Sequence, residues 1–207
     1  MPDLRFQVES AQPVPYSVTP VLGLRLRIEN QAAEEDIRSI LLQCQIRIET
    51  TRRPYNPIEQ KRLADLFGEP ARWSQTLRSM LWTNGSVVVP AFRSSTTVEL
   101  PLPCTFDLTV ASAKYFNGLD SGAAPLTLLF SGSVFYASDE GLQVTQIPWN
   151  QEASYALPVL VWKQMMDAYY PNVAWLGLRR DVFERLNQYK VAHGIATWEQ
   201  TLESMLP

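Results

Sequence analysis

The sequence predicts an α+β domain in which an antiparallel sheet carries C-terminal helices packed on one face. Three observations lead to this class. Apolar and polar residues alternate with period two through much of 1–51 and 96–148, a capped helical pattern interrupts 52–95, and the period becomes helical over 156–207. Strands followed by segregated helices are typical of α+β proteins. We expect a single domain over 1–207, because the mostly helical insertion is too short for a core of its own.

Strict alternation predicts three strands in the first part of the chain, over 4–8, 22–28 and 42–48. Alternation returns at Cys104 and continues toward Phe116. Strands of this kind have one buried and one solvated face, as in antiparallel sheets.

A long apolar run over 126–136 predicts a further strand. Gly132 lies inside this run and indicates a bulge or a close approach of two backbones. A short strand is expected after the turn at 139–141, from Leu142 to about Ile147.

The insertion begins with a helix signal, Asn56-Pro57-Ile58-Glu59, which places an N-cap, a first-turn proline and a capping-box glutamate in order. Gly68 is expected to end this helix. A second short helix is expected after Pro70, with its apolar side formed by Trp73, Leu77, Met80 and Leu81, and residues 83–86 form a predicted turn.

The C-terminal region predicts three helices. Pro158 suits the first turn of one, whose apolar face holds Trp162, Met166, Tyr169 and Tyr170. Asp181 suits the start of the second, and Gly194 is its expected C-cap. The sequence Thr197-Trp198-Glu199-Gln200 matches a capping box and predicts a short last helix.

Charge and hydropathy exclude several classes of partner. The net charge is −3 and the isoelectric point is about 5.3, without the basic stripe that nucleic-acid binding needs. No apolar run approaches the roughly 18 residues of a membrane helix. The N-terminus lacks a basic segment followed by an apolar one, so we expect no secretory signal and a cytoplasmic protein.

Metal, thiol and acid–base chemistry have few candidate residues. The chain has one His and two Cys, and we expect no metal site, cofactor or catalytic residue. Cys44 and Cys104 lie in alternating patterns that predict buried thiols, with a disulfide or metal pair as the alternative. His193 suits a helix C-terminus, and Asp139 and Glu140 suit a solvated turn.

Aromatic residues concentrate where the sheet pattern gives way to helices. One interpretation is that they close the core between sheet and helices. The other is that some of them line a groove that holds an apolar or extended polypeptide. The candidate partner-binding residues are Trp149, Tyr155, Trp162, Tyr169, Tyr170 and Trp175.

The C-terminal sequence has a distinctive order of helix signals. The segments Ala156-Leu157-Pro158, Asp167-Ala168-Tyr169-Tyr170-Pro171 and Trp175-Leu176-Gly177-Leu178 resemble a helix that ends before a proline and a short Leu-x-Leu linker. A second helix with Val182-Phe183, Leu186 and Tyr189 follows, and this order is similar to the C-terminal part of SecB-type export chaperones. The resemblance implies a SecB-like sheet with C-terminal helices and a client-binding role, whereas the insertion and the tail after Gly194 depart from the pattern.

A second resemblance covers more of the chain. Its residues are Cys44-Gln45-Ile46-Arg47-Ile48-Glu49, Arg62-Leu63-Ala64-Asp65-Leu66-Phe67-Gly68-Glu69-Pro70, Ala113-Lys114-Tyr115 and Met165-Met166-Asp167-Ala168-Tyr169. These segments resemble a mainly actinobacterial family whose genes lie beside those of uptake NiFe-hydrogenases. This resemblance implies an accessory role in hydrogenase assembly and identifies no catalytic residues.

The sequence therefore predicts a non-enzymatic, chaperone-like accessory protein that binds a protein client, and it is compatible with a homo-oligomer. One alternative is a structural subunit that buries the same aromatic residues permanently in a complex. Another is an enzyme of unknown chemistry, which would require a deep pocket lined by Asp139, Glu140 or His193. Solvent exposure of these three residues would count against that enzyme.

Overall fold

The computed structural model describes residues 2–32, 35–105, 110–173 and 176–206. The chain forms two compact units, Met1–Pro171 and Asn172–Pro207. The α+β class predicted from the sequence is confirmed. The division differs from the expected single domain over 1–207, since the last two helices belong to the smaller unit.

The larger unit contains a three-stranded antiparallel sheet. Its strands are β1 (Leu4–Pro13), β2 (Val21–Asn30) and β5 (Ser95–Pro103), in the order β1-β2-β5. Along β2 the leucines of the alternating pattern are fully buried and the intervening arginines are exposed, so the period-two pattern correctly predicts the buried face.

A five-stranded antiparallel sheet forms the other half of this unit. Its strands are β3 (Ile37–Ile48), β4 (Met80–Val89), β6 (Ala123–Ser138), β7 (Gly141–Gln146) and β8 (Glu152–Pro158). The order is β4-β3-β6, and β7 and β8 pair with successive halves of the long strand β6. The sequence patterns predict β6 and β7 but not β8.

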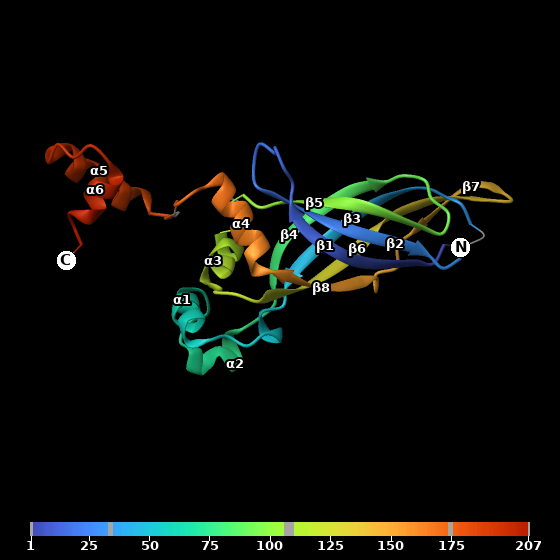
Figure 1. The fold of residues 1–207 in the computed structure, drawn as a ribbon, viewed down its shortest axis with the longest axis horizontal. Coiled ribbons are helices and arrows are strands. Elements are labelled where there is room, and N and C mark those ends of the chain that lie inside the picture. Colours follow the sequence, from blue (N-terminus) through green and yellow to red (C-terminus); the bar gives the residue numbers. More distant parts are fainter. Residues whose placement is uncertain (1, 33–34, 106–109, 174–175, 207) are drawn as a thin grey trace. The chain divides into compact units, whose positions relative to one another are not determined.

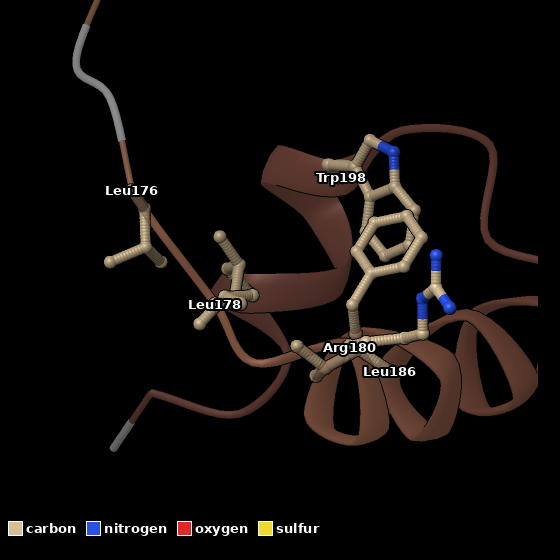
Figure 2. A pocket seen from close by; sticks show the side chains of 7 residues that line it. Leu176, Leu178, Arg180, Leu186 and Trp198 are labelled. Atoms are coloured by element: carbon tan, nitrogen blue, oxygen red, sulfur yellow. The ribbon is translucent and has the colours of Figure 1, made fainter. Parts of the chain in front are cut away.

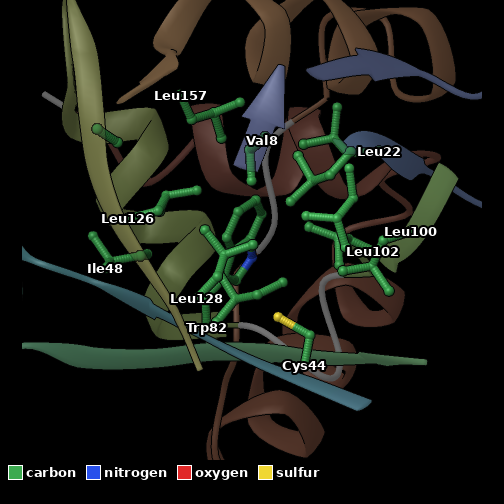
Figure 3. Packing of buried hydrophobic residues seen from close by; sticks show 14 of the residues in the cluster. Val8, Leu22, Cys44, Ile48, Trp82, Leu100, Leu102, Leu126, Leu128 and Leu157 are labelled. Atoms are coloured by element: carbon green, nitrogen blue, oxygen red, sulfur yellow. The ribbon is translucent and has the colours of Figure 1, made fainter. Parts of the chain in front are cut away.

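The core lies between the two sheets. The Phe6 ring on β1 stacks on the Phe130 ring on β6, with their centroids 4.3 Å apart. Buried side chains of both sheets meet in this layer (Figure 3), among them Val8, Leu22, Leu100, Leu102, Leu126 and Leu128. The expectation of one sheet covered by helices is therefore corrected. Alternation predicts an apolar face but does not reveal whether helices or a second sheet cover it.

The insertion over 52–95 is helical only in its first part. It holds α1 (Pro57–Phe67) and the short helix α2 (Trp73–Thr76). The capping box of Asn56 and Glu59 is present, and Gly68 ends α1 with φ of +77°. The remainder is strand β4, so the helix predicted through Met80 and the turn predicted at 83–86 are wrong.

Two features of β4 explain this error. A bulge leaves Trp82 without a partner on β3 and turns its ring inward, where it lies 5.0 Å from the Phe116 ring. Gly85 is buried inside the strand, and a Cβ there would lie 3.0 Å from a methyl carbon of Leu102. The glycine therefore serves close packing between β4 and β5 rather than a turn.

The alternation expected from Cys104 toward Phe116 also gives way to a helix, α3 (Val110–Gly118). Its buried residues are Ser112, Ala113, Tyr115, Phe116 and Gly118, at helical rather than alternating spacing. Cys104 follows β5 directly and is buried, whereas Phe106 and Leu108 lie outside the described residues.

The helix expected after Pro158 is α4 (Val159–Tyr169), with Pro158 as its N-cap. It contacts β1, β2, β8 and α3. Helices α1 to α4 lie together toward one end of the two sheets, away from the β6–β7 turn (Figure 1).

The smaller unit holds α5 (Arg180–Ala192) and α6 (Trp198–Glu203), and these helices contact each other. As expected, Thr197 caps α6, because its side chain accepts a hydrogen bond from the Gln200 amide. Across the part of the chain that the structure describes, every helix is too short or too polar to cross a membrane.

Candidate partner-binding site

The structure does not gather the six predicted aromatic residues on one surface. Trp149, between β7 and β8, is 93% exposed. Tyr155 on β8 and Tyr169 and Tyr170 at the end of α4 are half-buried. Trp162 is buried, and Trp175 lies outside the described residues.

Trp162 and Tyr169 have structural partners. The Trp162 ring stacks on the Phe116 ring at 5.0 Å, which fixes α4 against α3. The Tyr169 hydroxyl donates a 2.8 Å hydrogen bond to the carbonyl oxygen of Ser17, in the loop after β1. For Trp162 the core interpretation is the one that fits, because a side chain that is 2% exposed does not touch a partner in this conformation.

A buried polar network lies where α1 begins. The Arg53 guanidinium donates to the Glu59 carboxylate at 2.7 Å, and the side chains of this pair are only 10% and 3% exposed. The Glu59 carboxylate also accepts from the backbone amides of Asn56 and Asp120, at 3.1 and 2.9 Å. These bonds tie the start of α1 to the loop after α3, which is a structural task.

Tyr55 and Tyr115 extend this network. Their hydroxyl oxygens lie 3.1 Å apart, and the Tyr55 hydroxyl donates to the carbonyl oxygen of Thr50 at 2.7 Å. Burial raises the pKa of both phenols, so both remain protonated at neutral pH. Protonated, partnered phenols stabilise the fold here and offer no reactive oxygen.

The two cysteines are buried free thiols, as the first interpretation expected. Burial raises the pKa of Cys44 and of Cys104 to about 12. Each thiol therefore stays neutral and unreactive in the folded protein. No group of three or more His, Cys, Asp or Glu side chains is placed to hold a metal ion within the described ranges.

His193, Asp139 and Glu140 are all exposed. The His193 ring stacks on the Tyr189 ring at 4.0 Å, and its Nδ1 lies 2.9 Å from the carbonyl oxygen of Tyr189 at the end of α5. An active site at these residues would require a deep pocket around at least one of them. The exposure of all three side chains counts against such a site.

The smaller unit carries an apolar groove that the sequence analysis did not identify. Its volume is about 450 Å³. Leu176 and Leu178 come from the chain that leads into α5, and Trp198 lies across from them on α6 (Figure 2). The described residues that line it are Leu176, Leu178, Arg180, Phe183, Leu186, Trp198 and Leu202.

Helix periodicity places the groove residues together. Phe183 and Leu186 are three residues apart on α5, and Trp198 and Leu202 are four apart on α6, so each pair lies on one helix face. The Phe183 and Trp198 rings contact each other with their centroids 5.2 Å apart. These contacts hold the two helices side by side and form the floor of the groove.

The groove residues remain strongly exposed. Leu176 is 69% exposed, Phe183 47% and Trp198 36%. None of the residues of α5, all of which the structure describes, is buried. Contiguous apolar surface of this kind typically marks an interaction site.

Among the described residues that line this groove, Arg180 is the only charged one. Its neighbour Arg179 pairs with Asp181 at 2.8 Å, whereas no ion pair engages Arg180 within the described residues. The Lys190 amine lies 5.6 Å from the centroid of the Trp198 ring. The groove is therefore apolar with positive charge beside it.

One sequence signal could have identified this groove. The apolar residues of 176–202 recur at helical spacing after the sheet has ended, without a further strand to pack on. The sequence analysis used Phe183 and Leu186 only for the resemblance to SecB-type chaperones. In the structure these side chains line the groove.

Comparisons with known proteins place the chain in a family but not near a characterised protein. No curated protein matches it. Among solved structures, one that matches is β-glucosidase 3B from Thermotoga neapolitana in complex with α-D-glucose, at 14% identity and a TM-score of 0.26. That match covers 75% of this chain, which spans only 17% of the length of the glucosidase chain. The model of a family of unknown function, DUF6084, matches residues 1–207, and the chain belongs to this family.

Proposed function

We propose that this protein is a non-enzymatic accessory protein of the cytoplasm that binds a partner polypeptide in the groove of its C-terminal unit. The observation that carries the proposal is the groove itself, where large apolar side chains line about 450 Å³ and remain open to solvent. Removing such side chains from water on binding is favourable by roughly 25 cal/mol per Å² of apolar surface. A free surface of this kind therefore favours association.

The resemblance to proteins encoded beside uptake NiFe-hydrogenase genes makes a hydrogenase subunit the client to test first. The resemblance to SecB-type chaperones suggests that the client is held before it is fully folded. Apolar segments are accessible in such clients and become buried later in folding. Trp149 on the larger unit is kept as a further proposed contact, since its ring is 93% exposed.

The proposal is tested by aggregation and copurification of a destabilised hydrogenase subunit with the full chain. Leu176→Asp places a charge in the groove at a side chain that is 69% exposed, so it should not unfold the protein. Leu142→Asp on β7 is the matched control, since Leu142 is 66% exposed and lies outside the groove. We expect the wild-type protein and Leu142→Asp to retain the client and Leu176→Asp to lose it. Absence of retention by the wild-type protein, or equal retention by all three, would contradict the proposal.

The second candidate function is a permanent subunit of a complex. It is favoured by one observation, the lack of any buried residue in α5, because a partner that never leaves would supply the missing cover. A permanent subunit forms a stable, stoichiometric complex and has no effect on unrelated unfolding proteins. Light scattering with an unrelated, thermally unfolding protein therefore separates the two functions.

A further inference from the structure

Most of the described lining of the C-terminal groove consists of helix side chains, and Leu176 and Leu178 from the chain before α5 complete it. Phe183 and Leu186 project from α5, and Trp198 and Leu202 project from α6. Backbone amides and carbonyls in the middle of a helix bond to one another along that helix. The helical walls therefore offer no mid-helix backbone partners to an extended peptide, whose polar groups would stay unpaired where they lie against α5 and α6. A helix has no such cost, because its own backbone bonds are already made.

The spacing of the walls also fits a helix. Apolar side chains three or four residues apart form ridges, and a third helix places its own side chains between them. Recognition of this kind uses apolar anchors at positions i, i+3 or i+4, and i+7 of the bound helix. The groove is thus shaped for the apolar stripe of an amphipathic helix.

The charge of the groove lining indicates which residues should flank the apolar stripe of the bound helix. Arg180 lines the groove without a described ion pair, and Lys190 lies beside Trp198. An arginine at the edge of an apolar site binds carboxylates with well-defined geometry. A carboxylate next to the apolar stripe of the partner would reach this guanidinium, whereas a lysine there would be repelled.

The size of the unit supports the same conclusion. Domains shorter than about 40 residues usually need a disulfide, a metal or association to be stable. The C-terminal unit covers only Asn172–Pro207, and both cysteines lie in the larger unit. A partner helix would complete a small helical bundle and bury the exposed face of α5.

We propose that the occupant of this groove is an amphipathic helix of the partner polypeptide, with a carboxylate beside its apolar stripe that pairs with Arg180. The inference rests on the proposed function and specifies the class of segment that is recognised. A second copy of this chain is the competing occupant, and the experiment below distinguishes it.

The test uses the full chain and three labelled synthetic peptides of about 18 residues, which is five helical turns. All three carry leucines at i, i+3, i+4 and i+7 spacing. In the first peptide glutamates flank the leucine stripe, in the second lysines replace the glutamates, and in the third a central proline breaks the helix of the first. Fluorescence anisotropy reports binding. We expect the acidic helical peptide to bind at least about tenfold more tightly than either of the others.

Arg180→Glu tests the anchor directly. Arg180 is the first residue of α5, where a negative charge favours the helix, so this variant should fold. Arg185→Glu is the matched control, since it changes the net charge equally on the same helix at an exposed residue outside the groove. We expect Arg180→Glu to weaken binding of the acidic peptide about tenfold or more and to favour the lysine peptide. Arg185→Glu should stay within about twofold of wild type.

Four results would overturn the inference. Equal binding of the proline peptide would show that an extended chain is accepted. Equal effects of Arg180→Glu and Arg185→Glu would show that Arg180 is not the anchor. Absence of binding by every peptide would show that the groove does not bind isolated helices. If wild type still retained the client and Leu176→Asp lost it, the proposed function would stand and only the helix inference would fail. Sedimentation showing a dimer that Leu176→Asp dissociates would assign the groove to a second copy.

Discussion

Replacement of Glu59 by glutamine tests the buried network that joins α1 to the rest of the larger unit. The Glu59 carboxylate accepts from the Arg53 guanidinium at 2.7 Å and from two backbone amides. Glutamine keeps the size and shape of the side chain but removes the charge and turns one acceptor into a donor. The Arg53 guanidinium would then be buried without a counter-charge.

The expected loss follows from how strongly both groups are buried. Breaking a buried ion pair on one side costs about 3–5 kcal/mol, whereas an exposed pair is worth less than about 1 kcal/mol. Arg53 keeps its bonds to the carbonyl oxygens of Ala123 and Ser121, so we place Glu59→Gln at about 3 kcal/mol. For a unit of this size the corresponding fall in Tm is about 6–12 °C.

Urea unfolding at neutral pH, followed by circular dichroism, measures this loss. Asp65→Asn is the matched control, because Asp65 lies on the same helix and its ion pair with Lys114 is 74% and 55% exposed. We expect the control to lose less than about 1 kcal/mol. A loss for Glu59→Gln no larger than that of Asp65→Asn would refute the reasoning, since it would mean that the buried pair contributes no more than an exposed one.

Three further predictions follow from the described geometry. Gly132→Ala should destabilise the protein by about 3 kcal/mol or more, because the φ of Gly132 is +138° and a Cβ there would lie 2.0 Å from a backbone oxygen of β3. The control is Gly141→Ala, whose Cβ would meet nothing within 4 Å, and it should lose about 1 kcal/mol in the same urea titration. Cys44 and Cys104 should resist a thiol reagent in the folded protein below pH 9. Their folded pKa of about 12 exceeds the ordinary 9.0, so the stability from keeping these thiols neutral is complete below pH 9 and is lost as the pH rises toward 12; fast labelling at pH 8 without unfolding would contradict this. Trp149→Ala should leave the unfolding free energy within about 0.5 kcal/mol of wild type and reduce client retention, and unchanged retention would remove Trp149 from the proposed contact surface.

The sequence correctly predicted those helices and strands that a single local signal specifies. The alternation of leucine and arginine along β2 identified both the strand and its buried face. The cap formed by Asn56 and Glu59 identified the first turn of α1. The sequence did not reveal that the Glu59 carboxylate also pairs with Arg53, because that contact depends on how the segment just before α1 folds against its first turn.

Prediction failed where tertiary packing overrode a local pattern. The sequence Asn84-Gly85 favours a turn, but close packing against Leu102 requires the glycine inside β4. Residues 110–118 continue the alternating pattern and form α3 instead, with Tyr115 and Phe116 both fully buried. A bulge at Trp82 similarly changes which residues face inward, and a fixed period cannot anticipate it.

The six aromatic residues predicted to bind a partner remain a prediction, and the groove is lined by other residues among those described. Aromatic and aliphatic surface was expected near the junction of sheet and helices, yet Trp162 from that set is buried. The open apolar face lies later in the chain, where Phe183 and Trp198 form the groove floor. A helical period predicts an apolar face, but it does not reveal what covers that face.

The central claim is that the groove of the C-terminal unit is the surface that binds a partner polypeptide. Hydrogen exchange of the full chain, with and without a bound hydrogenase subunit, tests it most directly. A partner in the groove should slow exchange of the α5 and α6 amides, because burial of their exposed faces stabilises both helices against opening. We predict protection over 180–203 that Leu176→Asp abolishes and Leu142→Asp leaves intact. Protection confined to the sheets, with exchange in α5 and α6 unchanged in the complex, would contradict the claim.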